Sequence, residues 1–526
     1  MRSIGLRLFA ATSFMLLASH CVSTSAARPA THPRTGGTLR VEIHAPAISF
    51  DPREWQTGSL DSAANEKMAA LVFERLIALD NYGRFQPVLA TEWSHDGSGR
   101  RWQFIIRQGV KFSDGAPLTS ADVVTALQPL LPATQQISSS GSTIVIQSAT
   151  PSPDLLEQLA SGRYFVYRAL PGGRFAGTGP FVLSEPPSAN ANSTPGQHLY
   201  FRANDEAWAG RPFLDAIDAT LGVPPLRAMF DLQLGKADLI ELAPDLVPRA
   251  KQANLRTWSS QPTTLYALRF DDAQPAASDV RLREALSLSL DRGTMASVLL
   301  QKQAQPAATL LPQWLSGYAF LFNVDINLER AKELRRGLPT NEAAGVEPLR
   351  LRFDPSGDLP KLLGERVAIN ARQASILVQV ISRPSARANA SSQPLASDPP
   401  VGVHLFAWHY SSLSPRIELD SLFAAYNLSE SSEVNTTATD YEHLFERERR
   451  ALEERRVLPL VVQAESVALA SSVRDWMPAR WGEWHLADVW LDLPASAPPD
   501  SSNSSNTPVQ LPASQQARTP LPGAKQ

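Results

Sequence analysis

The chain has 526 residues, of which 43% are hydrophobic and 19% charged, so it can bury a substantial core. At ~150 residues per domain, this length predicts several domains. Its 49 lysines and arginines against 52 aspartates and glutamates leave a net charge of -3, which argues against a nucleic-acid-binding protein. The single cysteine, Cys21, excludes disulfide frameworks, thiolate zinc sites and cysteine nucleophiles from the rest of the chain.

The first 27 residues have the features of a signal peptide. Two arginines precede an apolar run at residues 8–17, which is too short to span a ~30 Å bilayer core. The small residues at 25–27 supply a cleavage site. We therefore expect an exported, periplasmic protein.

Cys21 raises the question of a lipid anchor. A leucine is expected three residues before a lipidated cysteine, but Ala18 stands there, and His20 occupies a position that favours a small residue. The sequence therefore favours a protein without a lipid at Cys21.

The other end of the chain, residues 494–526, consists mainly of proline, serine, glutamine and asparagine and has no aromatic residue. Such a segment cannot bury enough apolar area to offset the entropy lost on ordering. We therefore predict a disordered tail at 494–526.

Between these ends the pattern alternates between strands and helices. In chain order it predicts a strand at 38–43, a helix at 63–79, strands at 102–106 and 110–112, a helix after Thr119, a strand at 143–147 and a helix at 153–159. It then predicts helices at 279–300, 328–336 and 441–456 and a buried strand at 458–469. Thr119 and Asp122 have nearly the spacing of a capping box. The fold class predicted is mixed α/β, with several subdomains.

The motifs of common enzymes are missing from the sequence. It contains no phosphate-binding P-loop, no H-E-x-x-H zinc motif and no G-x-S-x-G nucleophile elbow. The glycine-rich GTGP at 177–180 is typical of a tight turn between strands. His404 and His409 are five residues apart, which places them on opposite faces of a strand and argues against a joint metal site. We therefore expect neither an enzyme nor a bound cofactor.

Eight blocks in series point to a known family. They are GGTLRVE at 36–42 with FDP at 50–52, VFERLIALDNYGRFQPVLATEW at 72–93, WQFIIRQGVKFSDGAPLTSADVV at 102–124, GTGPF at 177–181, RANDEAWAGRPFLDAI at 202–217, DVRLREALSLSLDR at 279–292, ERAKEL at 329–334 and LPLVV at 458–462. In this order they resemble the family-5 extracellular solute-binding proteins, which serve dipeptide, oligopeptide and nickel ABC importers. The block at 102–124 is the most specific.

The resemblance implies a periplasmic binding protein fold with two α/β lobes, an extra inserted domain and connecting strands. Carried over, lobe I comprises 36–75, 177–267 and 465–493, the inserted domain is 76–176, and lobe II is 268–464. The ligand would lie in the cleft between the lobes. Closure would occur about a hinge near Phe270 and Asp271, with the closed form favoured by ligand contacts in both lobes.

The segment FAWHYSSLSP at 406–415 supplies the candidate ligand-binding residues Trp408, His409, Tyr410 and Ser411. In peptide-binding members the corresponding run has an aspartate that pairs with the α-ammonium of the peptide, but Ser411 stands at that position here. A serine hydroxyl cannot replace a charge-assisted bond to a buried ammonium, so binding of a free-amine peptide is doubtful.

The function implied is capture of a peptide-like or other small solute and its delivery to an ABC permease in the inner membrane, by a monomer. Two alternatives remain open. One is a carrier of a metal chelate or haem that uses His409, and the other is a relative that no longer transports and acts as a sensor or scaffold.

Overall fold

The computed structural model describes residues 32–185, 198–318, 322, 325–338, 348–354, 358–382, 400–428, 440–476 and 478–492. The chain divides into two compact units, 1–33 and 34–526, and every element named below lies in the second. The predicted signal peptide with Cys21, and the predicted tail, lie outside the described residues. Within the described ranges, no helix is both long and apolar enough to cross a membrane.

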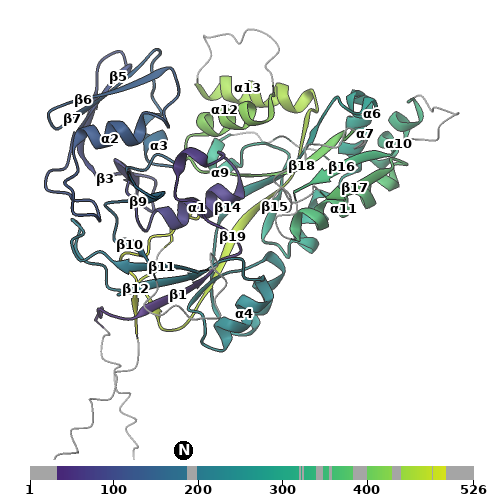
Figure 1. The fold of residues 1–526 in the computed structure, drawn as a ribbon. Helices are drawn as coiled ribbons and strands as arrows, with labels where there is room; N and C mark the ends of the chain where they lie inside the picture. The colour runs from purple at the N-terminus through teal and green to yellow at the C-terminus, as the bar shows by residue number, and fades with distance from the viewer. Residues whose placement is uncertain are drawn as a thin grey trace, which may run out of the picture. The chain divides into compact units, whose positions relative to one another are not determined.

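Eleven strands form one continuous mixed sheet, in the order β10-β11-β12-β1-β13-β19-β14-β18-β16-β17, with β15 paired to β19 (Figure 1). We call its first five strands the β1 half, and they are β10 (Phe181–Ser184), β11 (His198–Ala203), β12 (Ala216–Thr220), β1 (Thr38–Glu42) and β13 (Leu239–Glu241). Strand β1 runs parallel to β12 and β13. Leu39 and Val41 alternate with less buried residues along β1, so one face of the strand enters the core.

The last three strands of the path form the β18 half, in which β16 runs parallel to both neighbours. They are β18 (Val403–His409), β16 (Leu349–Phe353) and β17 (Val378–Ser382). Two long antiparallel strands, β14 (Arg256–Phe270) and β19 (Val457–Leu469), join the halves, and β15 (Ala304–Pro306) adds to β19. The β14–β19 register shifts between Ser259 and Thr264, around Pro262. Because proline has no N–H to donate, an irregularity of the ladder is expected there.

Residues 90–148 form a separate antiparallel sheet in the order β4-β5-β7-β6. Its strands are β4 (Ala90–His95), β5 (Arg101–Ile106), β7 (Thr143–Ser148) and β6 (Gln135–Ser140). Helix α2 (Ser120–Leu127) packs on β6 and β7 and begins with the capping box of Thr119 and Asp122. Three two-stranded sheets complete the strands: β2 (Ile77–Leu79) with β3 (Phe85–Pro87), β8 (Arg168–Leu170) with β9 (Arg174–Ala176), and β20 (Val473–Arg474) with β21 (Trp490–Leu491).

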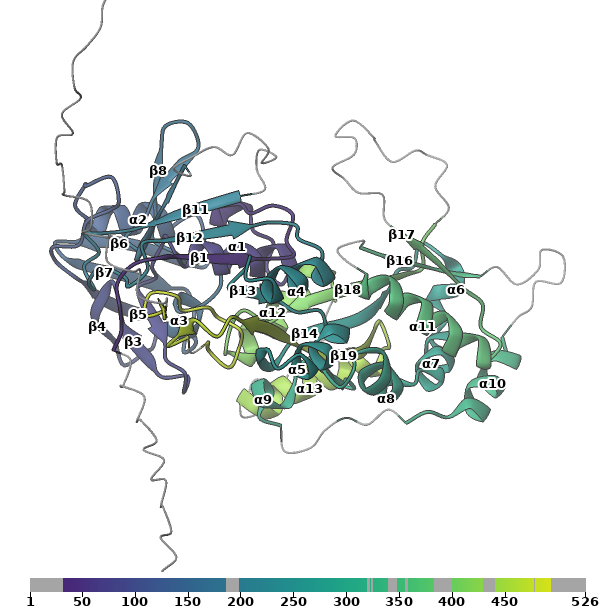
Figure 2. The same cartoon turned by 90° about the horizontal axis from the view of Figure 1, so that it is seen from below.

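Helices cover both faces of the central sheet (Figure 2). Over the β1 half lie α4 (Pro225–Gln233) and α5 (Val247–Gln252). One face of the β18 half carries α7 (Val280–Ser289), α10 (Leu328–Arg336) and α11 (Leu359–Gln373), and the other α9 (Gln313–Ser316), α12 (Pro415–Tyr426) and α13 (Asp440–Glu453). Short elements are η1 (Pro52–Glu54), η2 (Pro244–Leu246), α6 (Pro275–Ser278), α8 (Arg292–Thr294) and η3 (Met295–Leu299).

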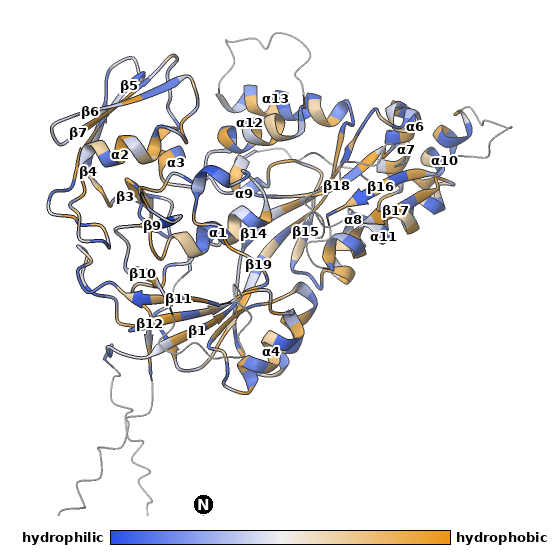
Figure 3. Cartoon of the chain, in the orientation of Figure 1, coloured by the Kyte–Doolittle hydropathy of each residue, from blue (hydrophilic) through white to orange (hydrophobic). Residues whose placement is uncertain are grey.

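The two cores of the β18 half follow from strand alternation. Leu265 and Ala267 on β14 enter one core, while Tyr266 and Leu268 enter the other. Successive side chains of a strand point to opposite faces, so a run of apolar residues serves both layers. Figure 3 shows the corresponding pattern in the helices, which carry both hydrophilic and hydrophobic segments.

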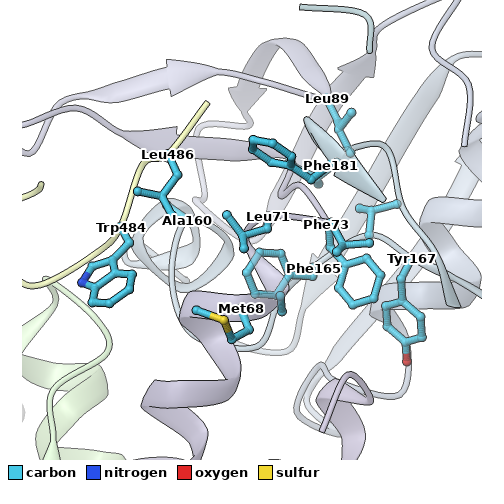
Figure 4. Packing of buried hydrophobic residues seen from close by; sticks show 14 of the residues in the cluster. Met68, Leu71, Phe73, Leu89, Ala160, Phe165, Tyr167, Phe181, Trp484 and Leu486 are labelled. Carbon is cyan, nitrogen blue, oxygen red and sulfur yellow. The ribbon is translucent and has the colours of Figure 1, made fainter. Parts of the chain in front are cut away.

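A third core surrounds α1 (Leu60–Ala69) and α3 (Leu155–Leu159) (Figure 4). It includes Met68 and Leu71, Phe165 from the segment before β8, and Trp484 from the C-terminal segment. The same cluster contains residues of the four-stranded sheet and of the β1 half. Residues near both ends of the described chain therefore meet in one core.

Three expected elements differ from the structure. The helix expected at 63–79 ends at Ala69, and 77–79 form strand β2. The helix expected at 279–300 breaks after Ser289, because Leu290 is extended and Asp291 caps a new turn through the N–H of Thr294. Of the strand expected at 110–112, only Lys111 is paired, in one isolated bridge to Pro117. Apolar spacing alone did not reveal these breaks.

Candidate functional site

A cavity of about 40 Å³ lies where α1, the end of β18 and the C-terminal segment meet. One water molecule needs at least ~10–15 Å³ of such a cavity, so this space can hold small groups of a solute. Its lining residues come from many parts of the chain: Ala63, Glu66, Lys67, Leu79, Ala160, Ser161, Trp314, His409, Tyr410, Ser411, Ser412, Leu413, Trp481, Gly482 and Glu483. Three of the four predicted ligand-binding residues are among them.

His409 is the last residue of β18 and lines the cavity with only 8% of its surface exposed. Its Nδ1 lies 3.4 Å from Thr264 Oγ1 and 3.6 Å from Glu465 Oε1. Burial lowers the pKa of His409, against the opposing effect of Glu465, so the imidazole is neutral at neutral pH.

Trp408 does not line the cavity, because it points to the other side of β18. Its indole N–H donates to Glu418 Oε2 at 2.9 Å, and only 1% of the residue is exposed. The ring packs on Gly58, where an added Cβ would lie 2.3 Å from the indole. The N–H of His409 donates to the carbonyl of Gly58 at 2.7 Å. The structure therefore places Trp408 in packing and hydrogen bonding, away from the space open to a ligand.

Tyr410 and Ser411 line the cavity, but their polar groups are largely engaged within the protein. The hydroxyl of Tyr410 donates to the carbonyl of Leu310. The backbone N–H groups of Ser411 and Ser412 donate to Glu418 Oε1 at 2.8 and 2.6 Å. The loop after β18 is therefore fixed by contacts behind the cavity wall.

Glu418, in the first turn of α12, is a residue that the sequence reasoning missed. It is 1% exposed, and its carboxylate accepts from the Trp408 indole and from the serine loop. Burial raises its pKa to about 7, against the hydrogen bonds from Trp408 and Ser412. The sequence did contain one signal for it. Ser414-Pro415 is typical of a helix start, and a helix that begins there places Glu418 in its first turn, beneath the loop of Ser411 and Ser412.

On the opposite wall, Lys67 of α1 lies between two carboxylates. Its Nζ is 3.2 Å from Glu241 Oε1 on β13 and 2.8 Å from Glu465 Oε2 on β19. Burial lowers the pKa of Lys67, but the two carboxylates outweigh burial and raise it above its usual range. Lys67 is therefore a fully ionised cation shared by Glu241 and Glu465.

The neighbouring residue, Glu66, belongs to a second set of the same kind. Arg75 donates from Nη2 to Glu66 and from Nη1 to Glu483 Oε1, the latter at 2.8 Å. The guanidinium lies 4.1 Å from the centre of the Phe165 ring. Burial raises the pKa of Glu66 to about 7, with Arg75 opposing and Glu483 adding to the rise. We call these two sets the Lys67 triad and the Arg75 triad.

The described residues contain no group of three or more His, Cys, Asp or Glu side chains arranged to hold a metal ion. His404, the other histidine of β18, lies 3.7 Å from Asp271 and apart from His409, as the strand alternation predicted.

Comparison with known proteins identifies the family. The profile of bacterial extracellular solute-binding proteins, family 5 Middle, matches residues 84–427. The chain belongs to this family. Its mixed α/β fold agrees, because the structure of the Escherichia coli murein tripeptide binding protein MppA superimposes with a TM-score of 0.71 at 17% identity, over 88% of this chain and 99% of that one.

Curated relatives of this family-5 protein are distant. "Protein XP55" of Streptomyces lividans is 26% identical over 432 residues, which are 73% of this chain and 76% of that protein. The nickel-binding periplasmic protein of Escherichia coli is 24% identical over 355 residues, which are 59% of this chain and 66% of that protein. The family resemblance and the fold class predicted from the sequence are confirmed. The chain is thus an ABC solute-binding protein and not an enzyme.

In this family-5 protein, Phe270 and Asp271 lie at the far end of β14. Phe270 is buried in the core of α7, α10 and α11, and Asp271 accepts from the N–H of Ala273. The β14–β19 pairing is irregular at 259–264, and its register shifts again between Tyr266 and Ala267. The hinge near Phe270 stays a prediction, and these register shifts mark other positions at which the shared strands are irregular.

Direct contacts bridge the cavity rim of the family-5 protein. Arg416 Nε on α12 donates to Asp154 Oδ2, just before α3, at 2.6 Å. An added Cβ at Gly162 would lie 3.6 Å from Ser411 Oγ. The predicted inserted domain therefore touches the end of the β18 half directly.

Proposed function

We propose that this chain captures a small solute in the cavity beside His409 and presents it to an ABC permease of the inner membrane. The observation that carries the proposal is the cavity itself, which α1 and the 481–483 loop line on one side and residues 409–413 on the other. Walls supplied by both predicted lobes are what a protein needs if ligand binding is to favour closure.

The proposed closure moves lobe II, 268–464, against lobe I and the inserted domain, with the boundaries given above. The ion pair of Arg416 with Asp154 and the bond from His409 N–H to Gly58 support a closed form that protein contacts also stabilise. A solute that needs more room than this cavity offers must therefore enter an open form.

Native mass spectrometry of the full chain, purified gently from its own periplasm, tests this function. We expect an added mass of a few hundred daltons that is lost on mild denaturation. A bare protein that also shows no thermal shift with peptides, sugars or metal chelates would favour the sensor or scaffold alternative. An adduct that persists unchanged when residues lining the cavity are substituted would also contradict the proposal, because it would be a contaminant bound elsewhere.

A metal-chelate carrier remains the second candidate, because His409 lines the cavity and a curated relative is a nickel-binding protein. Its test is a His409→Ala variant titrated with the nickel–histidine chelate. Equal affinity of variant and wild type contradicts this candidate, whereas a loss of at least tenfold supports it.

A further inference from the structure

Helix α4 carries a line of exposed apolar side chains. Leu226, Phe230 and Leu234 are 45%, 50% and 68% exposed, and we call them the α4 stripe. They are four residues apart, so at 3.6 residues per turn they lie within an arc of about 80°. The opposite face of the helix packs in the core shared with β13 and α5, to which it contributes Ala228, Met229 and Leu232. Single exposed apolar residues need no explanation, but three in line on one helix face do.

Two cations flank the stripe, and both are far more exposed than the carboxylate they share. The side chains of Arg227 and Lys236 are 75% and 67% exposed, and both pair with Asp231, which is 12% exposed. Arg40 of β1 is likewise more exposed than its partner Asp238. These pairs therefore leave their cations at the surface and hold their carboxylates beneath it.

The same asymmetry holds for the wider surface around α4, which lies at the lower edge of the ribbon in Figure 1. Residues 225–252, from α4 to the end of α5, contain four basic and four acidic side chains. All four basic residues are exposed, and they are Arg227, Lys236, Arg249 and Lys251. Of the acidic residues only Asp245 is exposed, since Asp231 and Asp238 are buried. The fourth, Glu241, belongs to the Lys67 triad. The outer surface here is therefore basic, although the whole chain has a net charge of -3.

Two titratable groups at the end of β1 do not change this balance. Glu42 is partly buried, and burial raises its pKa, with Asp231 adding to the rise and Arg227 opposing it. His44 lies 3.7 Å from Glu241, on the side of the Lys67 triad. Neither group adds a fully exposed negative charge beside the stripe.

The size and the charge of this surface decide between its possible occupants. A specific protein interface uses about 20–30 residues from each partner, so a stripe of three residues is too small for a stable dimer. A lipid surface needs fewer, because a few apolar side chains enter the headgroup boundary while flanking cations meet the lipid phosphates. The exposed basic residues favour anionic lipid over neutral lipid.

We infer that α4 is a contact site for an anionic phospholipid surface, with the α4 stripe between the headgroups and Arg227 and Lys236 against the lipid phosphates. This inference goes beyond the proposed function, since it does not depend on the solute. A helix of nine residues buries little apolar area, so the contact is weak and reversible. It keeps the protein near a membrane that contains a permease, and it uses no residue that lines the cavity.

Co-sedimentation of the full chain with lipid vesicles tests the inference. The vesicles contain either phosphatidylcholine alone or phosphatidylcholine with about 30% phosphatidylglycerol. A Cys21→Ser background excludes a lipid at that residue. We expect at least fivefold more protein on the anionic vesicles, and loss of this excess in about 0.5 M salt, which screens the charges. Absence of binding, or equal binding to both kinds of vesicle, overturns the inference.

Two substitutions in the stripe sharpen this test. Phe230→Ser and Leu234→Ser change residues that are at least half exposed, so the fold is retained, which a thermal melt checks. We expect each variant to bind the anionic vesicles at least fivefold more weakly than wild type. The matched controls are Tyr441→Ser on α13 and Val298→Ser on η3, at residues that are 67% and 62% exposed, and both should bind like wild type. Retained binding in both α4 variants contradicts the inference, because the vesicles would then contact another surface.

Other occupants of the stripe give other results. A second copy of the chain would appear as a concentration-dependent dimer in sedimentation velocity that Phe230→Ser abolishes. A protein partner would appear as binding to vesicles made from the native membrane and not to pure lipid. Either result, in place of binding to pure anionic lipid, overturns the inference. The proposed function then still stands, because native mass spectrometry detects a solute in the cavity whatever α4 contacts.

Discussion

The two walls of the cavity use buried carboxylates in opposite ways. On the α1 wall, Glu66 and Glu483 face the cavity and share Arg75, so their charge acts on the space between the walls. On the β18 wall, Glu418 lies behind the surface and accepts from Trp408, Ser411 and Ser412. The carboxylates of the α1 wall therefore contribute charge to the cavity, whereas Glu418 holds the residues of the β18 wall in position. A carboxyl near a cleft can be a recognition group or a structural one, and its donors decide which.

The largest expected effect comes from removing the structural carboxylate. Glu418→Ala leaves the Trp408 indole and two backbone N–H groups without their acceptor, which should reduce the free energy of unfolding by about 4 kcal/mol. Urea denaturation measures it. Glu333→Ala, on a 59% exposed side chain of α10, is the control and should change stability by less than about 0.5 kcal/mol. A similar small loss in Glu418→Ala would show that the serine loop does not depend on it.

Gly58 tests how closely the β18 wall approaches α1. Gly58→Ala places a Cβ against the Trp408 ring at a φ of +78°, and we expect a loss of about 3 kcal/mol. Gly109→Ala is a matched control, because its φ is +79° but nothing lies within 4 Å of the added Cβ. The control should lose only about 1 kcal/mol, from backbone strain. Equal losses of stability in the two variants would mean that the Trp408 ring moves aside at no cost in free energy.

Stability should fall as pH rises from about 5 to 7. Burial raises the pKa of Glu66, Glu74, Glu418 and Glu448 to about 7 in the folded protein, above their value in the unfolded chain. The folded state then binds more protons in this window, and each extra proton lowers stability by about 1.4 kcal/mol per pH unit as pH rises. Urea midpoints at pH 5.5 and 7.5 measure the effect. Glu74→Gln should flatten the profile, and a midpoint that rises with pH would contradict this account.

The smallest effect is expected at the rim. Arg416 and Asp154 are 38% and 29% exposed, so water weakens their ion pair, and we expect a coupling of about 0.5 kcal/mol. A double-mutant cycle of Arg416→Ala and Asp154→Ala in urea measures it. Asp154 makes no side-chain capping bond to α3, so its removal reports on the pair alone. A coupling that survives 1 M salt would show that the pair is more strongly buried than these exposures indicate.

The sequence predicted the elements that have a strong local signal. Helix α10 has the predicted bounds, 328–336, and Thr119 with Asp122 forms the capping box. Motif order predicted the family and the fold. His409 lies on the cavity wall, whereas Trp408 points away from it, because successive residues of β18 face opposite sides.

The charged wall could not be predicted from sequence. Glu66 and Lys67 looked like part of an ordinary amphipathic helix. Lys67 pairs with Glu465, 398 positions along the chain, and Arg75 pairs with both Glu66 and Glu483, which are 417 positions apart. A pairing over such a separation leaves no local pattern of residues. Glu418 was missed for a different reason, since a glutamate in the first turn of a helix is usually solvated and favoured by the helix dipole.

The long reach of the C-terminal segment also constrains how the chain matures. Strand β13 needs β19 as its neighbour, and Arg75 finds Glu483 408 residues later. The core around α1 therefore stays incomplete until residues near Trp484 have been made. Contacts of such high sequence separation slow folding and leave the edge of β13 uncovered in a nascent chain. In a chain of this topology, most residues are synthesised before the core around α1 can form. Cooperative folding of that core therefore comes only at the end of synthesis.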